Sequence, residues 1–553
     1  MLATFGIWDW TVVAAYFVVV TWVGVRMGRP RGSESTVGTG RGGVNAYFLG
    51  GRSIPVWTAM VSIVASSLSA ASFVGVPDTA FFGDISYLVL SLGGFISVFV
   101  VALLFVPKLY AAGTVTIYGF LAQRYGEPAR LAVSLAFIFG RMLASGSRLF
   151  LAAIPLSLLI WGAQTPSTLQ MVLAILLIGV IVTFYTVMGG VKAVVWLDVI
   201  QLAIVVGAAL LTVGILLYRI PLGLGGIFDL LRTTPVGTDG GNKLTVVRYS
   251  TDPALPYTLW TALLGQTVLG VAALGVDHDL AQRFLVTKSA AKGALSVILS
   301  QLLSVAVISL FLVIGLLLFV FYNRPDVMGV VYPLPDGGKG IYPWFLLNEL
   351  PPVLSGLCII GFFAVAQGSM DSAVNALAAS VVSDVIHPLR RRFGYVVDES
   401  SDWESKWVVA GVGAVMCGFA VFCALIYDPA QRTLLDFVLG VMTFAFTGML
   451  GVFLTALLTR RGSSASVVAA LLAGALTVLL LQDGILGWWS EALWGVRWKL
   501  AFPWWMTLGT TVAFAVCMIG NSPAPATSAP PSATPPIPPA SPISADPEAA
   551  QPK

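Results

Sequence analysis

A stretch from Gly361 to Ile386 combines the length of a membrane helix with side chains that could bind a cation. Its polar residues near the middle are Gln367, Ser369, Asp371, Ser372 and Asn375. Gln367, Asp371 and Asn375 are spaced by four, so they share one helix face. A carboxylate at this depth must face protein or water. The stripe therefore predicts either oxygen ligands for a hard monovalent cation or a polar seam between helices.

The composition identifies the class of protein that contains this stripe. Hydrophobic residues make up 57% of the 553 residues and charged residues only 10%, and the mean hydropathy is +0.90. These values predict an all-α polytopic protein whose surroundings are the lipid bilayer of the inner or plasma membrane. A net charge of +4 spread over short loops gives no indication of a nucleic-acid partner.

An enzyme is the weakest of the functions considered. The two histidines are far apart, and the four cysteines lie in apolar spans without the spacing of metal ligands. The sequence GGKG at 337–340 lacks the pattern of a phosphate-binding loop. We expect no catalytic residues.

The apolar spans set the topology. About thirteen of them approach the ~20 residues that cross a bilayer as a helix. Basic loops alternate with mixed or acidic ones, and the loop 26–52 holds five arginines against one glutamate. By the positive-inside rule, the N-terminus lies outside and the C-terminus inside.

Two spans have the composition of interrupted helices. AMVSIVASSLSAASFVGVPDTAF, at 59–81, is rich in hydroxyl residues and contains Gly75 and Pro77. LWTALLGQTVLGVAALGVDHD, at 259–279, has glycines at 265, 270 and 275. Such clusters, five spans apart, indicate two inverted five-helix repeats with broken helices. Close helix packing through small residues is the alternative.

These features divide the chain into six predicted parts. They are an extra N-terminal helix (1–28), a first inverted repeat (54–217), an extracellular loop (218–256), a second inverted repeat (257–460), two C-terminal helices (461–520) and a Pro/Ala-rich disordered cytoplasmic tail (521–553). The loops 218–256 and 322–352 are long enough to carry short helices.

The fourth span carries two arginines, Arg141 and Arg148, seven residues apart on one face. They are separated by roughly 10 Å along the axis, so they need not share a partner. One interpretation is structural: an arginine snorkels or pairs with an acid such as Asp198. The other is that Arg141 faces a cavity and binds a carboxylate, because a guanidinium suits that group.

Five motifs, in order, resemble the sodium/solute symporter family, which includes carriers of sugars, proline, iodide, monocarboxylates and sialic acid. They are YFLGGRSIP (47–55), SAASFVGVP (69–77), GGVKAVVWLDVIQ (189–201), DHDLAQRFL (277–285) and AQGSMDSAVNALAASVVSDVI (366–386). The resemblance covers residues 9 to about 460 and implies a fold of the leucine-transporter type, in agreement with the predicted repeats.

The resemblance also implies sodium ligands. Its main site takes backbone carbonyls of the first broken helix and groups of the stripe, here Ala65, Leu68, Val365, Gly368 and Ser369. Gly368 departs from the family pattern, where serine is usual. A second site would use Asp198, Asp371 and Ser372, although Leu197 replaces the usual threonine beside Asp198.

By the same mapping, the solute binds at the bilayer midplane beside Ser69, Ser72, Ser91 and Arg141. The amide side chains of sugar carriers are missing from these positions, which favours a small or acidic organic solute. We therefore expect a sodium-coupled secondary active symporter that imports a small organic solute, such as a carboxylate, by alternating access. The alternative is a membrane-embedded solute sensor or ion conductor on the same fold.

Overall fold

The computed structural model describes residues 6–28, 44–161, 167–237, 241–334, 340–397, 402–426 and 433–521. Within these ranges helices are joined by loops, and the strand structure consists of an isolated bridge between Ile54 and Thr287 and one short hairpin of β1 (Pro235–Val236) and β2 (Gly241–Asn242), in which Pro235 pairs with Asn242. Most of the basic loop 26–52, the GGKG sequence except Gly340 and nearly all of the predicted disordered tail lie outside the described residues.

By length and composition, nine of the described helices could each cross a membrane, or ten if one bent pair counts as a single span. They include α1 (Ile7–Gly28), α8 (Glu127–Trp161), α13 (Ala290–Asn323), α18 (Trp403–Ile426), α20 (Ser464–Leu481) and α22 (Phe502–Ile519). The predicted count of about thirteen and the orientation of the termini stay predictions.

One helix, α9 (Thr168–Arg219), is too long for a single crossing. Its 52 residues correspond to ~78 Å at 1.5 Å per residue, more than twice the ~30 Å hydrocarbon thickness. Gly190 interrupts it with a φ of 55°. A Cβ there would lie 2.8 Å from the carbonyl oxygen of Tyr47, so glycine permits both the bend and this contact.

The first of the two helices predicted to be broken is interrupted in the structure. α3 (Val56–Ser67) and α4 (Ala70–Phe82) are bent by 67° relative to one another, and Leu68 and Ser69 between them have extended backbone. The break lies among the hydroxyl residues, while Gly75 and Pro77 lie within α4.

The second predicted broken helix is also interrupted, between α11 (Thr267–Gly275) and α12 (His278–Leu285), after η4 (Thr261–Gln266). Its glycines also have the alternative role of close packing. A Cβ at Gly265 would meet Pro503 at 2.3 Å, and one at Gly270 would meet Ser97 at 2.4 Å.

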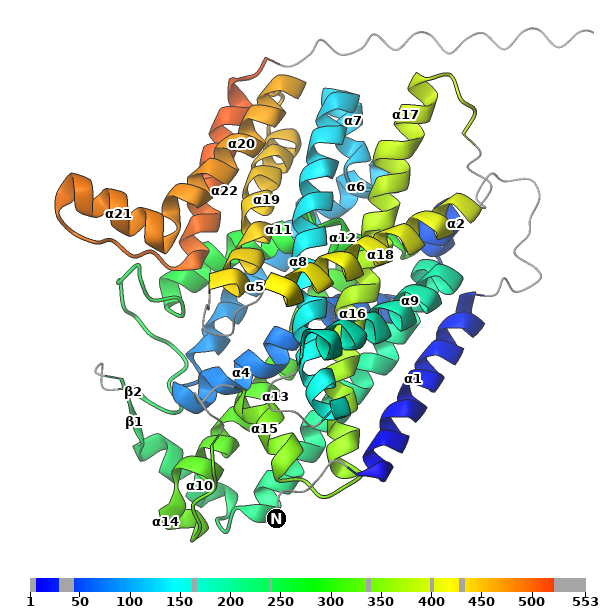
Figure 1. The fold of residues 1–553 in the computed structure, drawn as a ribbon. Helices are drawn as coiled ribbons and strands as arrows, with labels where there is room; N and C mark the ends of the chain where they lie inside the picture. The colour runs from blue at the N-terminus through cyan, green and yellow to red at the C-terminus, as the bar shows by residue number, and fades with distance from the viewer. Residues whose placement is uncertain are drawn as a thin grey trace, which may run out of the picture.

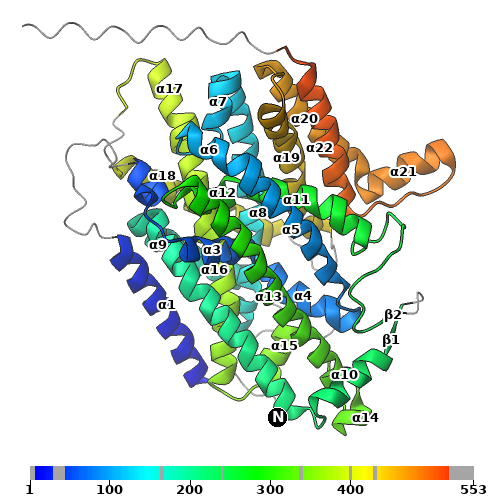
Figure 2. The ribbon, with the colours of Figure 1, turned by 180° about the vertical axis from the view of Figure 1, so that it is seen from behind.

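The polar stripe belongs to α16 (Leu354–Ser380), which continues through η6 (Val381–Ile386) into α17 (His387–Arg392). Every residue from Cys358 to Ser380 is buried. In Figures 1 and 2, α16 lies in the middle of the bundle, where it packs against α1, α3, α8, α9 and α18. This central position brings the stripe next to both halves of the chain.

The remaining elements surround this centre. They are α2 (Val44–Leu49), η1 (Gly50–Arg52), η2 (Ser86–Val89), α5 (Leu90–Val100), η3 (Val101–Phe105), α6 (Val106–Ala112), α7 (Gly119–Tyr125), α10 (Leu224–Thr233), α14 (Pro325–Met328), α15 (Ile341–Asn348), α19 (Thr433–Leu458) and α21 (Asp483–Trp494). The predicted long loops do carry short helices, α10 in the first and α14 and α15 in the second. α21 projects sideways from the bundle (Figure 1).

Candidate functional site

The stripe of α16 makes hydrogen bonds with three other elements. The Tyr16 hydroxyl of α1 donates to Gln367 Oε1 at 2.5 Å, and the Tyr185 hydroxyl of α9 donates to Asp371 Oδ2 at 2.9 Å. Asn375 Nδ2 donates to an amide oxygen of α12, Gln282 Oε1, at 3.0 Å. The stripe is therefore a polar seam, as the alternative interpretation expects.

Two oxygen atoms of the seam lack hydrogen-bond partners among the described residues. Asp371 Oδ1 and Asn375 Oδ1 are buried and have no hydrogen-bond partner in the described part of the chain. A buried acceptor without a partner costs free energy, and a bound cation would recover it. The seam and the cation site are thus compatible interpretations of the same residues.

Asp198 of α9 faces this stripe. The Ser62 hydroxyl of α3 donates to Asp198 Oδ2 at 2.5 Å, and Arg283 Nη2 lies 3.8 Å from the same oxygen. Asp198 Oδ1 has no partner among the described residues. It lies 3.5 Å from the point where a Cβ would stand on Gly368, so Asp198 is next to the stripe as the predicted second site requires.

The two serines of the predicted sodium sites are placed differently. The Ser369 hydroxyl donates to the Ala366 carbonyl of its own helix at 3.0 Å. The Ser372 hydroxyl donates to Asp279 Oδ2 of α12 at 3.2 Å. Ser372 therefore connects the stripe to the second broken helix.

Backbone carbonyls become available at the break after α3. The last helical bond there runs from Leu68 N to Val64 O, at 3.1 Å. Ser72 N donates to Ser69 O and not to the carbonyl of Leu68 four residues back. The carbonyls of Ala65 and Leu68 thus stand at a helix end, where intrahelical donors run out.

Arg141, predicted to bind the solute, is held by two carboxylates. Its guanidinium donates to Asp277 Oδ2 at 2.8 Å and also to Asp279 Oδ2. Arg283 Nη2 lies 3.7 Å from Asp279 Oδ1. Together with Arg141 of α8, these residues of the α12 segment form a buried ionic cluster of Arg141, Asp277, Asp279 and Arg283. The pairing interpretation is right in kind, but the partners are Asp277 and Asp279 and not Asp198. A role for Arg141 toward the solute stays a prediction.

Arg148 differs from Arg141, since no ion pair or hydrogen bond joins it to another described residue. Nine residues separate Arg148 from Phe139, which is the most exposed hydrophobic residue described on α8, at 69%. At about 100° per residue, the two side chains leave α8 on opposite sides. Arg148 therefore points into the bundle.

The serines predicted to face the solute lie near the first break, with one exception. Ser69 is buried within the break, and Ser72 is half-buried one turn into α4. Ser91 lies at the start of α5, where its carbonyl accepts from Gln301 Nε2 of α13 at 3.4 Å. Nothing in the described contacts brings Ser91 to the other two.

Buried aromatic rings pack together on the side of the break that the predicted orientation places outside. Phe73 stacks on Tyr342 of α15 at 4.7 Å between centroids, and Phe362 meets Phe73 at 5.7 Å. The Asp78 carboxylate accepts from the backbone amides at the start of α15, Gly340 at 2.8 Å and Ile341 at 3.1 Å. We call Phe73, Tyr342 and Phe362 the aromatic layer.

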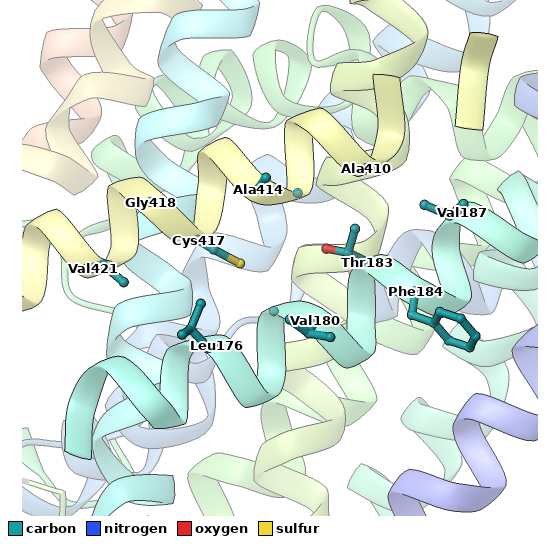
Figure 3. Close-up of a pocket in the computed structure, with 12 residues that line it drawn as sticks. Leu176, Val180, Thr183, Phe184, Val187, Ala410, Ala414, Cys417, Gly418 and Val421 are labelled. Carbon is teal, nitrogen blue, oxygen red and sulfur yellow. The ribbon is translucent and has the colours of Figure 1, made fainter. Parts of the chain in front are cut away.

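A separate groove of about 510 Å³ lies between α9 and α18 (Figure 3). Its lining is apolar except for Thr183 and Cys417, and it includes exposed side chains such as Val180 and Phe184. Such a lining lacks the convergent polar groups of a solute site. The groove is thus distinct from the polar centre around α16.

Sequence reasoning missed four residues of this centre: Gln201, Asp277, Asp279 and Gln282. Two signals were present. Gln201 follows Asp198 by three residues on one helix, and DHD follows the glycine that precedes the second break. Both patterns place polar groups on segments, α9 and α12, that pack against α16.

Comparison with known proteins gives a consistent result. A model described as the sodium:solute symporter family matches residues 47–474. The human sodium/iodide cotransporter is 28% identical over 396 residues, which are 70% of this chain and 57% of the relative. Human sodium-coupled monocarboxylate transporter 1 is 27% identical over 86% of this chain and 73% of its own.

A bacterial relative covers more of its own length. The sodium/sialic acid symporter of Proteus mirabilis is 27% identical over 501 residues, covering 87% of this chain and 91% of the relative. A solved structure of a Na⁺-coupled sialic acid symporter in a substrate-bound, outward-open state superposes with a TM-score of 0.74 at 23% identity. It covers 93% of this chain and 98% of its own, so the two share a fold.

Proposed function

Because the chain belongs to the sodium:solute symporter family, we propose that it imports a small organic solute together with sodium by alternating access. It is a multi-pass membrane transporter and not an enzyme. The observation that carries the proposal is the meeting of a broken helix with a buried polar helix whose oxygen atoms lack partners. The sensor and conductor alternatives gain no specific support.

We assign the main sodium site to the carbonyls of Ala65, Leu68 and Val365, together with Gly368 and the Ser369 hydroxyl. Carbonyl and hydroxyl oxygens are suitable ligands for a hard cation. Sodium bound there would hold the end of α3 against α16. Transport is coupled because sodium favours the conformation that binds the solute.

A second cation would bind beside Asp198, Asp371 and Ser372. Around them, the four carboxylates of Asp198, Asp277, Asp279 and Asp371 face the two guanidinium groups of Arg141 and Arg283. The carboxylates are in excess by two charges when all are ionised, or by one if Arg148 is counted. Buried charges need such compensation, which a cation supplies.

For the solute, we propose a small carboxylate bound near Ser69 and Ser72 and received by an arginine of α8. Two of the similar proteins are named for carboxylate-bearing solutes, monocarboxylates and sialic acid. Arg141 is held by two carboxylates, whereas Arg148 points into the bundle without an ion pair. Arg148 is therefore the stronger candidate, and Ser91 the weakest of the serines. The assignment of 54–217 and 257–460 as inverted repeats fits the two breaks.

The test is uptake into proteoliposomes by the full chain, preceded by a thermal-shift screen of lactate, pyruvate, sialic acid and glucose with and without sodium. We expect a carboxylate to stabilise the protein only in sodium and to accumulate against its gradient. Ser369→Ala should weaken sodium binding on the order of tenfold, because one hydroxyl ligand is lost. Uptake that is equal in sodium-free buffer would remove the coupling.

A second set of variants distinguishes Arg141 from Arg148 as the residue that binds the solute carboxylate. Arg148→Ala should abolish competition by carboxylates while sodium still stabilises the protein. Arg148→Lys should keep part of this competition, because lysine retains the positive charge but lacks the two parallel N–H donors of the guanidinium group. Unchanged carboxylate competition in Arg148→Ala would return the role to Arg141.

A further inference from the structure

Gly368, which stands where the family usually has serine, lies next to the side chain of Gln201 of α9. We propose that Gln201 Oε1 is a sodium ligand in this chain and replaces the side-chain hydroxyl that a serine at position 368 would provide. The inference rests on the proposed function, because it names a ligand of the sodium-binding region described above. It concerns a residue that sequence reasoning did not assign to any site.

The two positions compete for one space. A Cβ built on Gly368 would lie 2.8 Å from Gln201 Oε1 and 3.5 Å from Asp198 Oδ1. The first distance is too short for a real contact, so a serine at 368 would require Gln201 to move. Glycine leaves this volume to the amide oxygen, which lies 2.8 Å from the point where the serine side chain would begin.

Gln201 is also free to bind an ion. Its side chain is only 1% exposed, yet neither Oε1 nor Nε2 has a hydrogen-bond partner in the part of the chain that the structure describes. The Tyr16 hydroxyl lies within reach of the Gln201 side chain, but it donates its hydrogen bond to Gln367 Oε1 at 2.5 Å and so does not satisfy Gln201 Oε1. Burial of an amide without partners is unfavourable, so its retention needs a compensating ligand.

The neighbouring carboxylates are oriented in the same way. Asp198 and Asp371 each accept a hydrogen bond at Oδ2, from the hydroxyls of Ser62 and Tyr185 respectively, and each has no partner for Oδ1 among the described residues. Asp198 and Gln201 are three residues apart on α9, so both reach the same face of the helix. Hydroxyl donors thus fix one oxygen of each carboxylate, and the other oxygen of Asp198 stays available 3.5 Å from the Cβ position of Gly368.

This arrangement fits a monovalent cation. Oxygen is the preferred ligand atom of hard cations, and here an amide oxygen and a carboxylate oxygen of α9 lie 2.8 Å and 3.5 Å from the Cβ position of Gly368 on α16. A serine in place of Gly368 and an alanine in place of Gln201 would together restore a hydroxyl and remove the clash. The pair of positions is therefore open to a swap experiment.

The experiment measures sodium affinity of the purified full-length chain by the binding of ²²Na⁺ and by the sodium-dependent shift in melting temperature. Gln201→Ala should raise the sodium Kd on the order of tenfold, the equivalent of ~1.4 kcal/mol. Gly368→Ser should also raise it, because the serine displaces Gln201. The double variant Gln201→Ala/Gly368→Ser should bind sodium more tightly than either single variant.

Gln123→Ala, which changes an exposed glutamine, is the matched control and should keep the wild-type Kd. A double variant that binds no better than Gln201→Ala overturns the inference. If Gln201→Ala yields no folded protein by size exclusion, Gln201→Glu carries the test: the retained oxygen and added charge should keep or tighten sodium binding, and a tenfold loss overturns the inference. Wild-type protein that fails to bind sodium refutes the proposed function itself, whereas wild-type binding without recovery in the double variant refutes only the role of Gln201.

Discussion

The two sides of the break after α3 are closed by different chemistry. One side, which the predicted orientation places outside and which we call the outer side, has the aromatic layer of Phe73, Tyr342 and Phe362, in which α4 packs against α15 and α16. The other side, which we call the inner side, has the ionic cluster of Arg141, Asp277, Asp279 and Arg283, which joins α8 to α12. One side thus depends on ring contacts and the other on charge.

The difference predicts how each side opens. Aromatic contacts contribute about 0.5–1.5 kcal/mol per pair beyond burial and tolerate sliding. A buried ion pair that loses one partner costs about 3–5 kcal/mol, because the other charge stays uncompensated. The outer side can therefore adjust to a solute at low cost, whereas the inner side opens only when water or a cation compensates the separated charges. This asymmetry suits a carrier whose inner opening depends on bound sodium.

The largest expected effect comes from the inner side. Arg141→Ala leaves Asp277 and Asp279 without their main partner, so the folded state should lose about 3–5 kcal/mol of stability. The measurement is the melting temperature of the purified protein, followed by tryptophan fluorescence. Arg148→Ala breaks no ion pair within the described chain and should lower the melting temperature far less.

A triple variant separates charge from packing. Arg141→Met with Asp277→Asn and Asp279→Asn removes the charges while conserving volume, and stability should return toward that of the wild type. If Arg141→Ala melts at the same temperature as Arg148→Ala, the inner closure does not depend on these ion pairs, and the contrast between the two sides fails.

On the outer side the expected effect is smaller. Phe73→Leu keeps most of the volume but removes the ring contacts with Tyr342 and Phe362, at a cost of about 1 kcal/mol. Cys358, buried behind Tyr342 near Thr212, reports on opening. A membrane-impermeant maleimide should label it on the order of fivefold faster in Phe73→Leu. Cys358→Ala identifies background labelling, and an unchanged rate would show that the aromatic layer does not close this side.

Much of the fold follows from local patterns in the sequence. Apolar length identifies the long helices, nine or ten of which could cross a membrane in the described chain. The clusters of Gly and hydroxyl residues locate both breaks, because such residues lower the cost of leaving a helix. The length of α9 and its bend at Gly190 are harder, since the glycine there is required by the approach of Tyr47, which is distant in sequence.

The site is predictable only in part, for a related reason. The sequence identifies Gln367, Asp371 and Asn375 as one polar face, because they are spaced by four residues on one helix. The partners of Arg141 lie 136 and 138 residues away on α12, and no periodicity encodes how α8 and α12 are rotated against each other. The relation between Gly368 and Gln201 likewise exists only where α9 crosses α16.

The smallest expected effect concerns Asp78, whose carboxylate joins α4 to the start of α15. Asp78→Asn keeps one acceptor for the amides of Gly340 and Ile341 but loses the charge and the second oxygen, a change of about 0.5–1 kcal/mol. Labelling of Cys358 should rise about two- to fivefold. Asp326→Asn, in an exposed pair with Arg324 on α14, is the matched control and should leave the rate unchanged. An effect of Asp78→Asn that exceeds that of Phe73→Leu would mean that α15 is held by a carboxylate more than by rings, and the outer side would then resemble the inner one.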